Sequence, residues 1–168
     1  PLLLEMMSLA KSLGLSVSES HQDAYADVLF VGSVVTPEDY MAGAYAFLIT
    51  SRHEGLPTVA IMAAHLGLPI LASDCDGGGV RHLFNISDNA GLFDANHIDA
   101  EILGVILPVP DDSDCITISA WVNALQLLDS DPIIREKLLL GAEKISANHS
   151  VTVARKYWLS LIKRHFPF

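Results

Sequence analysis

The residues best suited to bind a ligand lie in one stretch, residues 51–79, which reads SRHEGLPTVAIMAAHLGLPILASDCDGGG. Glu54 and Gly55 stand just before Pro57, and proline suits the first turn of a helix. Backbone N–H groups at a helix start bind phosphate, and a carboxylate accepts hydrogen bonds from hydroxyl groups. Proline itself has no N–H, so the remaining donors are Leu56, Thr58 and Val59. The stretch predicts a ligand site, although the helix dipole alone would also favour an acid here.

The second glycine-rich turn, DCDGGG at residues 74–79, is a weaker feature. Asp74 and Asp76 have the D-x-D spacing of some metal sites, but they lead into three glycines, where aspartates suit a turn. We therefore expect no metal ion. The glycines at 77–79 would allow the backbone to approach a ligand closely. Cys75 is expected to be a small buried residue and not a nucleophile, because no motif places a histidine beside it.

Strand-like and helix-like segments alternate around these turns. The expected strands are residues 26–32, 44–50 and 69–73, with short extended pieces at 89–93 and 104–109, and the first two read as strands buried on both faces. The expected helices are residues 2–13, 36–43, 57–66 and 80–84, with a polar loop at 16–23. This alternation predicts an α/β fold with a parallel sheet flanked by helices. Ligands of such sheets bind beyond the carboxyl ends of the strands.

The last third of the chain, about residues 114–165, is expected to be helical. Apolar residues recur there at helical spacing in three segments, and Asp131 with Pro132 would start the second. Tyr157 and Trp158 belong to the third apolar stripe and are expected in the core. With 168 residues, the chain fits a single domain, residues 1–168.

The composition restricts the classes of partner. The chain has 10 Lys and Arg against 20 Asp and Glu, a net charge of −10, which argues against nucleic acid or anionic membrane as the main partner. Two cysteines favour a reducing, cytoplasmic setting over a disulfide scaffold. No apolar run has the length of a membrane span, and no signal peptide is evident. The chain begins at Pro1 without an initiator methionine, which predicts a fragment of a longer protein.

The order of the motifs resembles glycosyltransferase family 4, the retaining sugar-nucleotide transferases with a GT-B fold. Members commonly read S-R-x-E-G-x-P, then a helix, then G-x-P and a D-C-x-x-G turn. This chain has SRHEGLP at residues 51–57, GLP at 67–69 and DCDGG at 74–78, with VLFVG at 28–32 as a further match. Each motif alone is weak, but together they occur in the family's order along nearly the whole chain.

The resemblance implies that the chain is the Rossmann-like C-terminal half of a GT-B fold, without its N-terminal elements, and that it binds the donor. Glu54 would be the catalytic carboxylate that orients the donor sugar. The implied donor-binding residues are Gly32, Ser33 and Val34 at the base, Arg52, Gly55, Leu56, Pro57 and Thr58 at the phosphates, and Met62 at the ribose.

Two positions depart from the family pattern. Met62 stands where the second glutamate of the family's E-x7-E pair would accept hydrogen bonds from the ribose hydroxyls. A thioether cannot replace those charged acceptors, although helical packing is a sufficient structural reason for a methionine. Arg81 stands where the family often has a glutamate. The pattern therefore retains the first carboxylate and lacks two others.

The implied function is the retaining transfer of a hexose from a UDP- or GDP-sugar to a saccharide or lipid-linked acceptor. The longer protein would be a hexosyltransferase of polysaccharide or glycolipid synthesis, and this chain alone would be inactive. No cofactor is implied beyond the sugar nucleotide. The acceptor would bind through the N-terminal domain, in the cytoplasm or at the inner face of a membrane with peripheral association.

Two alternatives stay open. The chain could be a non-catalytic binding domain on a degenerate glycosyltransferase scaffold, which Met62 and Arg81 favour. It could also be part of a nucleotide-sugar epimerase with the same fold, against which the SRHEGLP motif argues.

Overall fold

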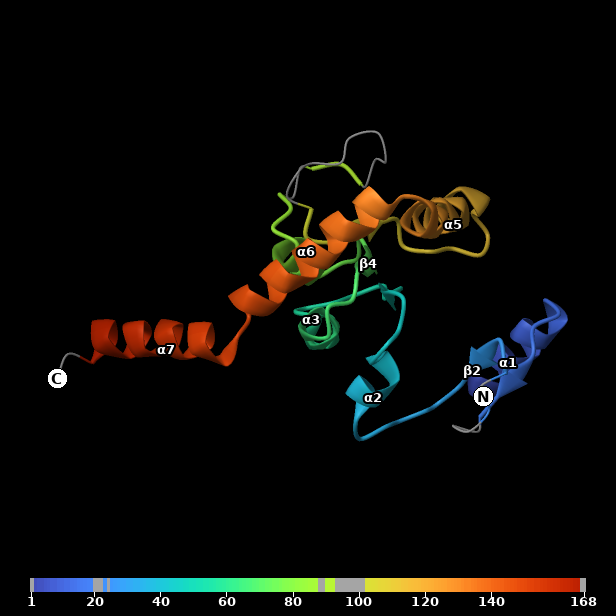
Figure 1. Cartoon of the computed structure of the whole chain (residues 1–168), viewed down its shortest axis with the longest axis horizontal. Helices are drawn as coiled ribbons and strands as arrows, with labels where there is room; N and C mark the ends of the chain where they lie inside the picture. The colour runs from blue at the N-terminus through green and yellow to red at the C-terminus, as the bar shows by residue number, and fades with distance from the viewer. Residues whose placement is uncertain (1, 20–22, 24, 88–89, 93–101, 167–168) are drawn as a thin grey trace. The chain divides into compact units, whose positions relative to one another are not determined.

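The computed structural model describes residues 2–19, 23, 25–87, 90–92 and 102–166. Its contacts divide the chain into two compact units, Pro1–Pro37 and Glu38–Phe168. Both units contain helices and parallel strands (Figure 1). The α/β class expected from the alternating pattern is confirmed, with parallel sheets flanked by helices.

The first unit contains a helix followed by two short parallel strands. Helix α1 (Leu2–Ser12) is followed by Gly14, whose positive φ of 80° suits glycine at a helix end. Strands β1 (Val17–Ser18) and β2 (Val28–Leu29) pair in parallel. β1 lies inside the expected polar loop, because two residues are too few to leave a strand pattern in the sequence. Both residues of β2 are half-buried, so the expectation of a strand buried on both faces is wrong.

The second unit is built on a sheet of three parallel strands. The strands are β3 (Phe47–Ile49), β4 (Ile70–Ser73) and β5 (Val105–Leu107). From residue 37 onward, the helices are α2 (Pro37–Met41), α3 (Thr58–His65), α4 (Gly79–Leu83), α5 (Cys115–Ser130), α6 (Pro132–Asn148) and α7 (Val151–His165). The helices expected after residue 36 are present, and so are the strands expected at 44–50, 69–73 and 104–109, each shorter than its apolar run suggested. Of the extended piece expected at 89–93, the described residues 90–92 belong to no strand.

β4 is the central strand of this sheet and is hydrogen-bonded to β3 and β5 on its two sides. All four residues of β4 are buried. β3 is less covered, because it is an edge strand in the described sheet and Leu48 is 41% exposed. The expectation of a fully buried strand at residues 44–50 is therefore wrong at Leu48, since an apolar run reports residue type and not coverage.

Helices cover both faces of the three-stranded sheet. On one face, Ile70 and Ile106 belong to a core cluster with residues of α3, α4 and α6. On the other face, Leu71 and Leu107 pack in a second cluster with α5, including Trp121. Helix α6 contributes to both clusters and contacts both α3 and α5 (Figure 1). The alternation of side chains along each strand thus produces a helix–sheet–helix arrangement.

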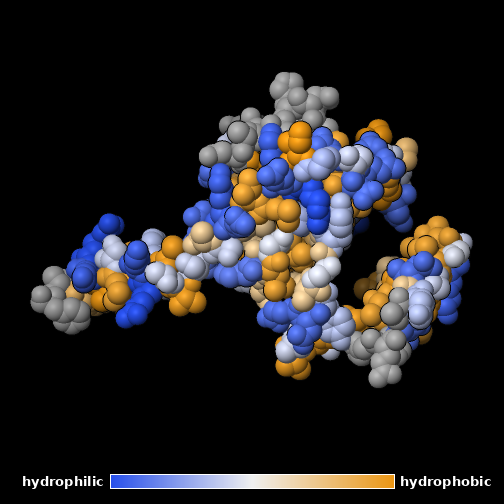
Figure 2. All heavy atoms as spheres, viewed as in Figure 1, coloured by the Kyte–Doolittle hydropathy of each residue, from blue (hydrophilic) through white to orange (hydrophobic). Residues whose placement is uncertain are grey.

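Helix α7 has a more exposed environment than α5 and α6. None of its described residues is buried, and Tyr157 and Trp158 are both 64% exposed. Figure 2 shows hydrophobic and hydrophilic residues side by side on its surface. The expectation that these two aromatic side chains lie in the core is wrong, because helical spacing marks an apolar face without showing that anything covers it. Like every other helix in the described ranges, α7 fails the length and hydropathy that a membrane crossing requires.

The start of α6 offers a test of local stability. The side chain of Asp131 accepts hydrogen bonds from the backbone N–H groups of Ile133 at 2.9 Å and Ile134 at 3.3 Å. Removing this cap by Asp131→Ala should lower the free energy of unfolding by about 1 kcal/mol in urea titrations followed by circular dichroism.

Asp129→Ala is the matched control for this cap. Asp129 is an exposed acid in the last turn of α5, where the helix dipole disfavours negative charge. Its replacement should leave the free energy of unfolding unchanged or slightly higher. An equal loss of stability in both variants would contradict the capping role of Asp131.

Candidate functional site

Two turns meet at one edge of the three-stranded sheet. Residues 51–57 follow β3, and residues 74–78 follow β4. Because β3 and β4 are parallel neighbours, their carboxyl ends lie at the same edge. The stretch that the sequence singled out therefore forms one local structure, at the edge where parallel sheets bind ligands.

Hydrogen bonds continue the pairing of β3 and β4 into these turns. The hydroxyl of Ser73 donates to the backbone carbonyl of Ser51. Beyond it, the Glu54 N–H donates to the carbonyl of Asp76 at 2.9 Å, and the Gly79 N–H donates to the carbonyl of Glu54 at 3.4 Å. The backbone of Glu54 is therefore held on both its N–H and its C=O by the turn after β4.

Two glycines allow this contact between the turns. A Cβ atom on Gly77 would lie 2.3 Å from the carbonyl oxygen of Glu54, and one on Gly79 would lie 1.3 Å from that of Gly55. The close neighbour of Gly77 and Gly79 is the other turn, 23 and 24 residues away in sequence, a contact that no local pattern could reveal. The expected approach of this backbone to a ligand stays a prediction.

The carboxylate of Glu54 is half-buried and has one hydrogen-bond donor in the described part of the chain. Ser51 Oγ donates to Glu54 Oε1 at 2.6 Å. The sequence interpretation did not select Ser51, which stands three residues before Glu54. The second carboxylate oxygen is available to a ligand.

The backbone N–H groups at the start of α3 lie directly after this carboxylate. Pro57 occupies the cap position, where it offers no side-chain hydrogen bond to the first turn of the helix. Gly55, Leu56 and Thr58 are exposed, while Pro57 is buried. A phosphate could therefore reach uncapped N–H groups one to five residues from Glu54.

Arg52 is exposed and lies near the loop that follows β5. The pKa of Asp111 in that loop is below its usual range, mainly because the hydroxyl and the N–H of Ser113 donate to its carboxylate. The positive charge of Arg52 lowers the same pKa further. Arg52 thus shares its edge of the sheet with an acidic loop, which competes with a phosphate for its charge.

Asp74 and Arg81 form an ion pair that fixes the second turn. Arg81 donates to both carboxylate oxygens of Asp74, through Nε at 2.7 Å and Nη2 at 2.6 Å. Its Nη1 donates to the carbonyls of Ser87 at 2.8 Å and Ala90 at 3.0 Å. The first aspartate of the D-x-D pattern is thus paired with an arginine. Cys75, between the two aspartates, is buried as expected.

Met62 is half-buried and packs against the core cluster formed by α3, α4 and the sheet. It lies in the middle of α3, beside the fully buried Ala63. Packing therefore accounts for an apolar residue at this position, as the sequence interpretation allowed.

The remaining predicted site residues, Gly32, Ser33 and Val34, belong to the first unit. Gly32 has a positive φ of 65° and is exposed, as is Ser33, whereas Val34 is half-buried. The structure describes these three residues within their own unit, and their role at the base stays a prediction.

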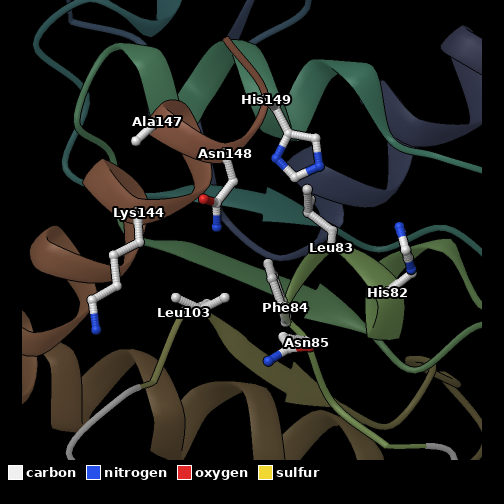
Figure 3. A pocket seen from close by; sticks show the side chains of 9 residues that line it. All are labelled: His82, Leu83, Phe84, Asn85, Leu103, Lys144, Ala147, Asn148 and His149. Atoms are coloured by element: carbon white, nitrogen blue, oxygen red, sulfur yellow. The ribbon is translucent and has the colours of Figure 1, made fainter. Parts of the chain in front are cut away.

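A separate cavity is lined by residues at and after the end of α4, by Leu103 before β5 and by residues at and after the end of α6 (Figure 3). It has a volume of about 570 Å³ and is lined by His82, Leu83, Phe84, Asn85, Leu103, Lys144, Ala147, Asn148 and His149. Leu103 precedes β5, whereas Glu54 follows β3. None of the predicted site residues lines this cavity.

Because the two turns are in contact, adding a single methyl group at Gly79 should lower the stability of the fold. Gly79→Ala forces the Gly55 carbonyl to move, so it should lower the free energy of unfolding by about 1–3 kcal/mol, as overpacking does. Gly55→Ala is the matched control, because its Cβ would meet no atom within 4 Å. Thermal unfolding of the two variants checks this prediction. Equal melting temperatures would show that the turns are not in contact.

Comparison with known proteins connects this site to one family. Residues 12–106 match the family described as Glycosyl transferases group 1. An uncharacterized glycosyltransferase of Haemophilus influenzae is 31% identical over 102 residues, which cover 61% of this chain and 26% of that protein.

Solved structures share the fold at lower identity. The GtfA/B complex aligns with a TM-score of 0.61 at 19% identity, over 97% of this chain and 32% of that one. The Anabaena protein Alr3699/HepE, in complex with UDP and glucose, also aligns with a TM-score of 0.61 at 19% identity, over 95% of this chain and 36% of that one. The chain thus has the α/β fold of GT-B glycosyltransferases and spans about a quarter to a third of these relatives. Since the family match covers more than half of its 168 residues, the chain belongs to the Glycosyl transferases group 1 family.

Proposed function

We propose that this chain is the donor-binding part of a retaining glycosyltransferase, which transfers a hexose from a nucleoside-diphosphate sugar. The observation that carries the proposal is the position of Glu54. Its half-buried carboxylate lies next to the uncapped start of α3, at the edge where parallel sheets bind ligands. The chain also belongs to a glycosyltransferase family, and a structural neighbour was solved with UDP and glucose.

The two halves of the donor would bind different parts of this site. A diphosphate is an anion, and the N–H groups of Leu56, Thr58 and Val59 at the start of α3 offer donors and the positive end of a helix dipole. The sugar hydroxyls are hydrogen-bond donors, which suit the free oxygen of Glu54. In the transfer step, the same negative charge would stabilise positive charge that develops at the anomeric carbon.

Arg52 would add a positive charge near the phosphates, moderated by the neighbouring Asp111. Residues 32–34 would contact the base, and among them Gly32 and Ser33 are exposed. Met62 would face the ribose without accepting strong hydrogen bonds, because a thioether is a weak acceptor. The donor would thus be held more by its diphosphate and sugar than by its ribose.

The rest of the reaction is proposed for a longer protein, since the chain spans 26% of its Haemophilus relative. The donor would be a UDP- or GDP-hexose, and the acceptor a saccharide or lipid-linked sugar bound by another domain. The reaction would retain the anomeric configuration, need no further cofactor, and take place in the cytoplasm or at the inner face of a membrane.

One other function is favoured by specific residues. Met62 and Arg81 stand where acids are expected, and both have structural roles, in core packing and in the ion pair with Asp74. A scaffold that had lost catalysis would show such replacements. In that case the chain would be a binding domain without donor turnover.

The role of Glu54 is tested by calorimetric titration of the protein with UDP and with UDP-glucose. Glu54→Gln keeps the shape of the side chain and removes its charge. It should weaken UDP-glucose binding about tenfold or more, because hydrogen bonds to charged groups contribute about 1.5–3 kcal/mol, and should leave UDP binding within about twofold. Glu143→Gln, at an exposed position on α6, is the control. Unchanged UDP-glucose affinity in Glu54→Gln would refute the site.

Experiments at Met62 distinguish an active transferase from a binding domain that has lost catalysis. The longer protein with Met62 in place is expected to turn over a UDP- or GDP-sugar. Met62→Glu should tighten binding of the nucleoside diphosphate about tenfold by adding a charged acceptor. Met62→Gln controls for the loss of packing. A protein that binds no nucleotide with Met62, and does so only after Met62→Glu, would support the degenerate scaffold instead.

A further inference from the structure

We propose that Ser51 is a positioning residue, which orients the carboxylate of Glu54 so that a single oxygen is presented to the donor sugar. This inference rests on the proposed function, because it assigns the role of a second residue at the same site. It concerns a residue that contacts Glu54 and is not assigned any contact with the substrate.

The contact itself is short and well placed. Ser51 Oγ donates to Glu54 Oε1 at 2.6 Å, within the range of hydrogen bonds from a hydroxyl to a charged acceptor. Both residues are half-buried, which limits competition from water. In the described part of the chain, no other side chain or N–H donates to the Glu54 carboxylate. The bond therefore decides which way the carboxylate faces.

Ser51 is itself fixed by the central strand. Ser73, the last residue of β4, is completely buried, and its hydroxyl donates to the Ser51 carbonyl. At the other end of the contact, Asp76 and Gly79 hold the backbone of Glu54. Both partners of the Ser51–Glu54 bond are thus anchored to the same strand and turn. Such support preorganises a side chain before the ligand arrives.

The bond has a consequence for substrate recognition. With Oε1 directed at Ser51, Oε2 is the oxygen best placed to accept from a sugar hydroxyl. Loss of the Ser51 hydroxyl would let the carboxylate rotate and would weaken binding of the sugar, while the diphosphate, bound by backbone N–H groups of α3, would be unaffected. If Ser51 only stabilised the turn, its loss would instead weaken binding of both the sugar and the diphosphate.

The test compares binding of UDP, which lacks the sugar, with binding of UDP-glucose; GDP and GDP-mannose form a second pair of probes. In calorimetric titrations of the protein, Ser51→Ala should lower the affinity for the sugar nucleotide about fivefold to tenfold. It should leave the affinity for the nucleoside diphosphate within about twofold. Ser51→Thr keeps a hydroxyl and should bind within about twofold of the original protein. Ser119→Ala, at an exposed position on α5, controls for the substitution.

A second measurement assigns the effect to Glu54. In the Glu54→Gln background, Ser51→Ala should cause no further loss, because the two side chains act together. Three results would overturn the positioning role and leave the proposed function in place. Ser51→Ala could lower the affinity for both ligands equally, lower neither affinity, or add its full effect to that of Glu54→Gln. If the unmodified protein binds neither pair of probes, the proposed function and this inference both fail.

Discussion

The backbone contact between the turns after β3 and β4 is the constraint on which the candidate site depends. Parallel pairing brings the two strand ends to one edge, and Gly77 and Gly79 let the turns touch without an intervening side chain. The contact holds Glu54 by its N–H and its carbonyl. The carboxylate and the start of α3 are therefore placed by the sheet itself, and not by a free loop.

The candidate site thus has a part that hydrogen bonds hold in place and a part that lacks the acids of the family pattern. Glu54, Ser51 and Ser73 form a continuous set of hydrogen bonds from the buried end of β4 to an exposed edge. In contrast, Met62 and Arg81 face inward or to other protein groups, where the family pattern has acids. Recognition would therefore depend on the diphosphate and the sugar. The family pattern, with its second glutamate, would divide recognition more evenly between sugar and ribose.

Local sequence patterns predicted the elements well and their contacts poorly. Helix α3 and strand β4 follow from a compact apolar block, the Gly-Leu-Pro stop and a buried run. The partners of Gly77 and Gly79 could not be predicted, because they lie in the other turn. Ser51 could have been considered from the sequence, because it stands only three residues before Glu54. Tyr157 and Trp158 were placed in the core in error, since a helical stripe does not show what covers it.

We propose that a nucleoside diphosphate binds where the two turns meet. Backbone amide chemical shifts, measured by NMR during titration with UDP, test it residue by residue. We expect the largest changes at Gly55, Leu56 and Thr58, before and at the start of α3. Changes concentrated instead on His82, Asn148 and His149, which line the separate cavity, would contradict this binding site.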